Sequence, residues 1–252
     1  MMIGLLGKKL GMTHVYDPYG RRMGVTVVQA GPCTVLNVRE PGKDRYAAVQ
    51  LGFETIAEKK LNKARTGQFK KLKLGPFKHV KELRLMNGAK PEEFKAGQQV
   101  TVELFKEWEL VDVIGISIGK GFQGGMKRWG WHGGSETHGS MSHRAPGSIG
   151  STTTPGRVIR GHHLPGHMGN RRTTVQNIRI VGINTEKHLL LLQGAVPGSD
   201  NSLIAITKSV KRTGVIRKPQ EILNVVDEDD ENLSKTAKAA KKKLPTQKPA
   251  AA

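Results

Sequence analysis

Hydrophobic residues in the first 53 positions come in short runs that predict β-strands. The runs are rich in Val, Ile and Leu, and turn-forming pairs such as Gly31-Pro32 and Pro41-Gly42 separate them. A further turn is predicted at Asp17-Pro18-Tyr19-Gly20. The expected strands cover residues 3–6, 24–29, 35–39 and 46–53.

Strand-like runs return after residue 98. Residues 99–105 alternate, with Val100, Val102 and Leu104 on one face, which predicts a strand. Further strands are expected at residues 110–118, 175–183, 189–193 and 203–207. Residues 54–97 are Lys-rich and predict only short helices, at 68–74 and 91–95, which indicates an insert.

These strands predict a mainly β fold. They are short and do not alternate with helices, which favours a closed antiparallel or mixed β-barrel over a parallel sheet. We expect the barrel domain to comprise residues 1–116 and 173–210, with 54–97 as a small α+β insert. Trp108 adjoins a strand rich in Val and Leu and is expected in the core. Lys8, Lys9, Arg21 and Arg22 near the turns suit either a solvated face or contact with RNA.

The strand pattern stops between residues 117 and 172. This segment holds 14 glycines, three prolines and only five Val, Ile or Leu residues, which indicates an irregular extension loop. Structureless loops longer than about 12–15 residues are uncommon in compact domains unless they are functional. Because the segment lacks apolar residues for a core of its own, we expect a partner to order it. Residues 211–252, an acidic cluster followed by an Ala/Lys tail, are expected to be disordered.

Charge indicates what the partner is. The chain has 41 Lys and Arg against 21 Asp and Glu, a net charge of +20, which predicts a polyanion. Residues 117–172 have the highest density of positive charge, with eight cations and one acid among 56 residues. Cys33 is the sole cysteine, so a disulfide scaffold and a Cys-based zinc module are excluded. No apolar run of 18–20 residues and no signal-peptide pattern occurs, so a reducing intracellular compartment is expected.

Enzyme signatures in the loop fail on their context. Residues 119–124 match G-x-G-x-x-G, but too many glycines follow for the required helix, and the position about 20 residues on is near Arg144 rather than an acid. Six of the nine histidines lie in the loop, yet Glu136 is its only carboxylate, which argues against a metal site and a hydrolase triad. We therefore expect no enzyme activity, no cofactor and no metal.

The same residues suit RNA binding. Arginine makes forked phosphate contacts, aromatic and histidine rings stack on unpaired bases, and glycine lets the backbone approach phosphates. DNA is less favoured because no helix-turn-helix, zinc finger or basic zipper is visible. The candidate RNA-binding residues are Lys120, Lys127, Arg128, Trp129, Trp131, His138, His143, Arg144, Arg157, Arg160, His163, His167, Asn170, Arg171 and Arg172.

Several motifs resemble the bacterial large-subunit ribosomal protein three (L-three) family over about residues 2–210. The opening run at residues 3–13 resembles the start of that family, and Gly-Ala-Val-Pro-Gly at 194–198 also matches it. The loop contributes Gly-Lys-Gly-Phe at 119–122, Lys-Arg-Trp at 127–129, Thr-His-Gly at 137–139, Ser-His-Arg at 142–144, Pro-Gly-Ser-Ile-Gly at 146–150, Thr-Pro-Gly at 154–156 and Gly-Asn at 169–170.

The resemblance implies a structural constituent of the large ribosomal subunit, located in the cytoplasm. Such a protein binds large-subunit rRNA, helps to nucleate subunit assembly, touches neighbouring ribosomal proteins and extends a loop toward the peptidyl transferase centre. We expect the loop tip at Gly147, Ser148, Ile149, Gly150, Ser151, Thr152, Thr153, Thr154 and Pro155. Many family members carry a glutamine, methylated in some, where this chain has Thr153. A non-ribosomal RNA chaperone or assembly factor is the alternative, and no membrane or small-molecule substrate is expected.

Overall fold

A computed structural model of the chain describes residues 4–17, 19–85 and 91–211. Apart from Lys211, the tail expected to be disordered lies outside the described residues. Within the described ranges, no helix is both long and apolar enough to cross a membrane.

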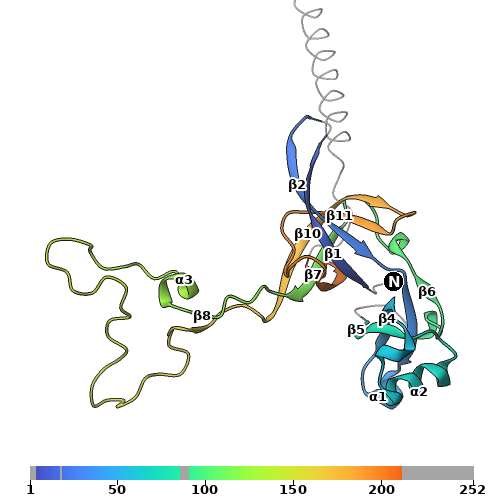
Figure 1. Cartoon of the computed structure of the whole chain (residues 1–252), viewed down its shortest axis with the longest axis horizontal. Coiled ribbons are helices and arrows are strands. Elements are labelled where there is room, and N and C mark those ends of the chain that lie inside the picture. Colours follow the sequence, from blue (N-terminus) through green and yellow to red (C-terminus); the bar gives the residue numbers. More distant parts are fainter. Residues whose placement is uncertain (1–3, 18, 86–90, 212–252) are drawn as a thin grey trace, which may run out of the picture.

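Six antiparallel strands form a closed barrel in the order β1-β12-β7-β10-β11-β2, with β2 paired back onto β1 (Figure 1). The strands are β1 (Leu5–Tyr16), β2 (Arg22–Ala30), β7 (Leu110–Ile116), β10 (Arg172–Asn184), β11 (Leu189–Gln193) and β12 (Leu203–Lys208). Alternate residues of β11 and β12 fill the interior, where Leu190, Leu192, Ile204 and Ile206 are buried, as the period of two along a strand requires. The prediction of a mainly β chain is confirmed.

A second, four-stranded sheet of order β5-β4-β3-β6 packs against the barrel and shares its hydrophobic core. Its strands are β3 (Cys33–Arg39), β4 (Ala48–Thr55), β5 (Phe77–Arg84) and β6 (Gln99–Val100). The prediction that the strands at 35–39 and 46–53 belong to the barrel is wrong, and β5 was not predicted. The local pattern of a buried strand is the same in either sheet, so only long-range pairing distinguishes the two.

The strand predicted over residues 99–105 is mostly a helical turn. Only β6 is extended, and the short 3-10 helix η3 (Val102–Leu104) follows it. The buried residues are Val102 and Phe105, three positions apart, and that spacing places both on one face of a 3-10 turn. The predicted alternation instead counted Leu104, which is only partly buried.

Short helices occur around the second sheet. They are α1 (Pro41–Asp44), η1 (Glu58–Lys60), α2 (Lys63–Leu72) and η2 (Pro91–Glu93). Helix α2 starts five residues before the predicted 68–74 helix, because the side chain of Asn62 caps it by accepting the Arg65 amide at 3.0 Å. Phe69 of α2 packs with Leu36 and Phe77 in a separate small core.

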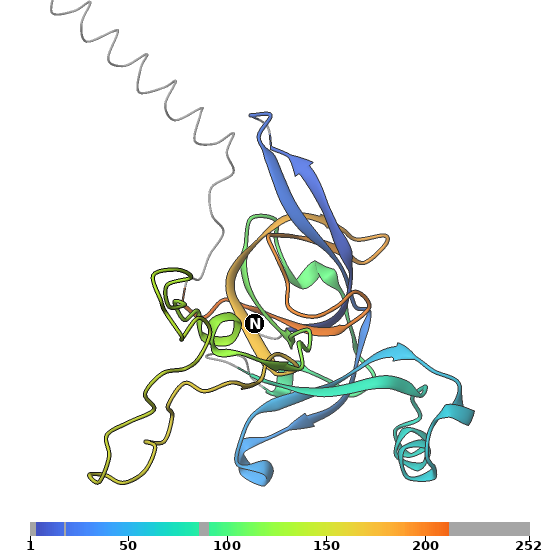
Figure 2. The same cartoon turned by 60° about the vertical axis from the view of Figure 1, so that its left-hand side comes forward.

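Strands β1 and β2 continue beyond the barrel as a protruding arm (Figures 1 and 2). The predicted strands, 3–6 and 24–29, cover only part of this arm. The predicted turn at its end is confirmed at Asp17, whose carbonyl accepts the Gly20 amide at 2.9 Å. Trp108 is buried, as expected.

Candidate nucleic-acid interface

The predicted loop is a long extension that leaves the barrel between β7 and β10 (Figures 1 and 2). We call residues 117–172 the extension. Its two ends meet, because Ile116 and Arg172 are register partners in the β7–β10 ladder. Arg172 is the first residue of β10 rather than a loop residue, so the predicted boundary is one residue late.

A narrow two-stranded neck, residues 117–123 and 166–171, joins the extension to the barrel. The Ser117 amide donates to the Arg171 carbonyl at 2.9 Å, and the Lys120 amide donates to the Met168 carbonyl at 2.9 Å. The short strands β8 (Phe122–Gln123) and β9 (Gly166–His167) continue the pairing. The neck thus extends the barrel ladder outward, which the sequence analysis did not predict.

Glycine is required at the base of the neck. Gly169 has φ +78°, and a Cβ there would lie only 2.1 Å from the Ile118 carbonyl oxygen. A side chain would therefore push the two neck strands apart. The Gly-Asn motif at 169–170 thus has a structural reason.

The short helix α3 (Gly125–Trp129) follows the neck. The sequence analysis expected no helix here because of the glycines. Gly124 and Gly130 lie at its two ends, where Gly130 adopts the left-handed conformation that terminates helices. Gly125 is buried because the Trp131 indole occupies the space where a side chain would stand.

An aromatic clip ties α3 to the returning strand of the extension. The Trp129 ring stacks on the His163 imidazole, with centroids 4.0 Å apart and planes 7° from parallel. The Trp129 indole N–H donates to the Leu164 carbonyl at 2.9 Å, and Arg128 donates to the same oxygen at 2.6 Å. The Arg128 guanidinium also lies 5.0 Å from the Trp129 ring centroid.

The distal part of the extension has few internal contacts. His143 makes a 2.9 Å hydrogen bond through Nδ1 with the Ser135 carbonyl, and the Gly134 amide donates to the His143 carbonyl at 3.1 Å. At the predicted tip, the Ser148 hydroxyl donates to the Gly150 carbonyl at 3.2 Å. Every residue from 141 to 163 is exposed, including the whole tip at 147–155.

The structure brings Arg128, Trp129 and His163 together in the clip, and Trp131 and His163 line one hollow. All the predicted residues lie on the extension, and all are exposed except Arg128 and Trp131, which are partly buried. His132 and His162, which the sequence analysis did not select, line the same open hollow of about 670 Å³ beside Trp131. No local sequence signal distinguishes these two histidines from the other four.

Ion pairs compensate several charges around the two sheets of the globular part, and none involves the extension among the described residues. The ion pairs surround Glu54, Arg39 and Glu109, whereas residues 117–172 hold one carboxylate against eight cations. A 2.9 Å hydrogen bond from Lys78 lowers the pKa of Glu54. Burial, helped by the Lys78 ammonium, lowers the pKa of His79.

Lys9 serves the fold rather than RNA. It is buried, and its ammonium donates to the carbonyls of Val196 at 3.2 Å and Gly198 at 3.0 Å. Gly198, with φ +100°, lies so close to Ile116 that a Cβ would stand 3.1 Å from the Ile116 carbonyl oxygen. The 194–198 loop therefore supports the foot of the extension. Lys8 lies 3.8 Å from Glu54, which partly neutralises it.

Comparison with known proteins finds one consistent set of relatives. The family model described as ribosomal protein L3 matches residues 85–189. The protein named large ribosomal subunit protein uL3 of Gloeobacter violaceus is 49% identical over 215 residues, covering 84% of this chain and 99% of its own length. The protein of the same name from Trichlorobacter lovleyi is 48% identical over 210 residues, 83% of this chain and 98% of its own. The Brachyspira hyodysenteriae uL3 protein is 44% identical over 211 residues, which cover 84% of this chain and 96% of its own length.

Proposed function

Because the chain belongs to the ribosomal protein L3 family, we propose that it is a structural constituent of the large ribosomal subunit that binds large-subunit rRNA directly. It works in the cytoplasm as part of the ribosome, beside neighbouring ribosomal proteins, and helps to nucleate subunit assembly. It is a ribosomal protein and not an enzyme, in keeping with the names of its relatives.

The domain organisation is part of this proposal. Residues 1–116 and 173–210 form the globular platform, a closed barrel with the second sheet packed on it, and residues 117–172 form the RNA-penetrating element. The ring of strand pairs supports the barrel assignment, since each of its six strands has a partner on both sides. The pairing of Ile116 with Arg172 supports the boundaries of the extension.

The surface of the extension is the observation that carries the proposal. Of the 14 exposed large hydrophobic residues in the described part of the chain, seven lie in the extension, beside the uncompensated cations. Fixing the backbone costs about 1–2 kcal/mol per residue, and exposed residues gain no burial in return. An RNA that pairs its phosphates with the cations and covers the apolar side chains supplies the missing stabilisation.

The candidate residues of the extension fall into two groups with different roles. The exposed arginines, among them Arg144, Arg157 and Arg160, bind phosphates through their forked donors. Trp129 and His163 stack on one another, so the interpretation of both as base-stacking residues is replaced by a holding role in the clip. The exposed tip at 147–155 reaches toward the peptidyl transferase centre.

Stoichiometric incorporation tests the proposed function. Tagged protein expressed in a bacterial host should sediment with mature large subunits at one copy each and resist a high-salt wash. An RNA chaperone or assembly factor would sediment only with immature particles, and that result would overturn the proposal. Chemical footprinting of the rRNA in particles with and without the protein should then show protection by the extension.

A further inference from the structure

A second cationic surface lies on the globular part. Residues 57–73, which include η1 and α2, hold seven Lys or Arg residues and one acid, Glu58. All seven cations are exposed, and the ion pairs of the described residues lie elsewhere. This charge is therefore as uncompensated as that of the extension. We call residues 57–73 the lysine surface.

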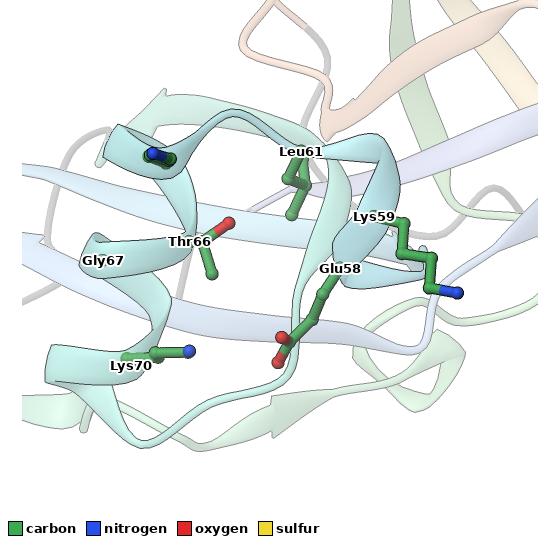
Figure 3. Close-up of a pocket in the computed structure, with 7 residues that line it drawn as sticks. Glu58, Lys59, Leu61, Thr66, Gly67 and Lys70 are labelled. Carbon is green, nitrogen blue, oxygen red and sulfur yellow. The ribbon is translucent and has the colours of Figure 1, made fainter.

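The lysine surface contains an open hollow of about 490 Å³ between η1 and α2 (Figure 3). Its lining residues are Glu58, Lys59, Leu61, Lys63, Thr66, Gly67 and Lys70. Figure 3 shows the Lys70 side chain extending into the hollow and that of Lys59 pointing away from it. Gly67, in the middle of α2, leaves open space where a side chain would stand, and this lets a strand approach the helix backbone.

The packing of α2 leaves its lysine-bearing face free to bind a ligand. Phe69 points inward to the small core with Leu36 and Phe77, so the helix is held from its opposite side. Lys63 and Lys70 are seven residues apart, which is about 10 Å along a helix. A ligand with phosphates in series can pair with the cations along this length, whereas a single phosphate would leave most of the seven uncompensated.

We propose that the lysine surface binds the phosphate backbone of a second RNA segment, one that the extension does not touch. This inference deepens the proposed function and rests on it for the identity of the polyanion. Figures 1 and 2 place α2 and the extension on opposite sides of the barrel, so the two surfaces face different RNA segments. The protein thus holds two parts of the RNA in a fixed relation.

Composition favours RNA over an acidic protein as the partner. Protein interfaces are enriched in aromatic residues, Met and Arg and depleted in Lys, whereas the lysine surface has six Lys, one Arg and no Tyr, Trp or Met. Among the described residues, the exposed large hydrophobics lie outside this segment. With no aromatic ring to stack on unpaired bases, the surface is suited to the backbone of a duplex rather than to an unpaired strand.

The two RNA surfaces differ in their cations, and this difference is measurable. The extension has six Arg and two Lys residues, and the lysine surface has one Arg and six Lys. Lysine is a strongly hydrated point charge without the forked geometry of arginine. When the charges of the lysine surface are removed, the affinity should therefore fall by the same factor for every RNA sequence. Binding should also become less dependent on salt.

The test uses the full chain with three exposed lysines replaced, K59A/K63A/K70A, and large-subunit rRNA transcript as the probe. Losing three phosphate contacts on a duplex should lower the slope of log K against log salt by about 3 units and the affinity at 0.1 M salt by several hundred-fold. The control K43A/K106A/K187A removes the same charge from scattered exposed sites and should change both much less. A 20-base-pair duplex RNA of arbitrary sequence should show the same loss in slope.

Glu58 gives a second, opposite test. It is the sole carboxylate of the surface, so Glu58→Gln should raise the affinity several-fold, a gain that misfolding cannot imitate. If K59A/K63A/K70A and Glu58→Gln both bind rRNA like the parent while R144A/R157A/R160A binds weakly, the inference is overturned and the proposed function stands. If the arginine variant also binds like the parent, the inference and the RNA role of the extension both fall.

Discussion

The barrel and the extension bury their side chains to opposite degrees. In the barrel, Leu5, Leu192 and Ile206 are fully buried, whereas every residue from 141 to 163 of the extension is exposed. The barrel is thus stabilised by its own core, and the extension by a neck, a clip and glycine geometry. The difference teaches that one chain can combine a fold held by its own core with a segment held by a few local contacts.

Removing arginines from the extension should have the largest effect, and only on RNA binding. R157A/R160A/R171A/R172A removes four phosphate contacts, so affinity for large-subunit rRNA at 0.1 M salt should fall about 10³-fold, with a flatter salt slope. Filter binding across 50–300 mM salt measures both quantities. The matched variant K43A/K95A/K106A/K187A should keep most of the affinity, and an equal loss there would mean that net charge alone drives binding.

A pair of core and surface truncations should affect stability unequally. Leu192→Ala removes a fully buried side chain and should lower the free energy of unfolding by about 2–5 kcal/mol. Ile159→Ala removes a side chain that is 67% exposed, so its effect should stay within about 0.5 kcal/mol. Urea denaturation of the RNA-free protein measures both. A comparable loss for Ile159→Ala would contradict the division into two regions.

Breaking the clip should loosen the extension without touching the barrel. Trp129→Ala removes the His163 stack and the hydrogen bond to Leu164, which together contribute about 1–3 kcal/mol locally. Amide exchange in α3 should speed up accordingly, while β7 and β11 stay protected. Trp129→Phe keeps a ring for stacking and should lie between Trp129→Ala and the parent. Without RNA, the neck should show intermediate protection, and residues 141–163 almost none.

Acid should weaken the globular part through His79 and Glu54. Both have folded-state pKa values below their ordinary ones, so the unfolded chain binds more protons, and stability falls as pH drops from 7. The His79 contribution falls below about pH 6.5, and that of Glu54 below about pH 4.5. His79→Gln should flatten only the first part of a melting-temperature profile against pH. A flat parent profile between pH 7 and 5 would exclude this origin.

The tip should be the most tolerant site for folding. Thr153→Gln changes an exposed residue, so the thermal midpoint should move by about 1 °C or less, while subunit assembly or translation is perturbed. Threonine has no side-chain amide, so mass spectrometry of residues 147–156 should find no amide methylation in the parent. A methyl group mapped to this peptide, or failure of the variant to fold, would contradict the prediction.

Local signals predicted several of the barrel strands. Leu189–Gln193 was predicted to the residue, since its run of leucines is bounded by His188 and Gly194, and the glycine content predicted the start of the extension at residue 117. The second sheet was not predicted, because β3 and β4 have the same local pattern as barrel strands and β6 pairs with β3 from far away in the sequence.

The candidate functional residues were likewise only partly predictable from the sequence. The abundance of Arg and Trp in the extension pointed to it as the candidate surface, but the roles of single residues depended on contacts across the fold. The pattern could not reveal that Trp129 faces His163, 34 positions later, or that Lys9 lies under the 194–198 loop. The lysine surface was recognised as Lys-rich, yet its exposure on one side of α2 became apparent only with Phe69 placed in the small core.

The pairing of Ile116 with Arg172 bears on how the length of the extension can vary among related chains. Both ends of the segment are fixed at one rung of the β7–β10 ladder, so the barrel experiences the segment only as a closed loop. The entropy of closing a flexible loop rises with the logarithm of its length, and doubling the length costs only about 0.6 kcal/mol. The barrel therefore sets almost no limit on how far the extension reaches.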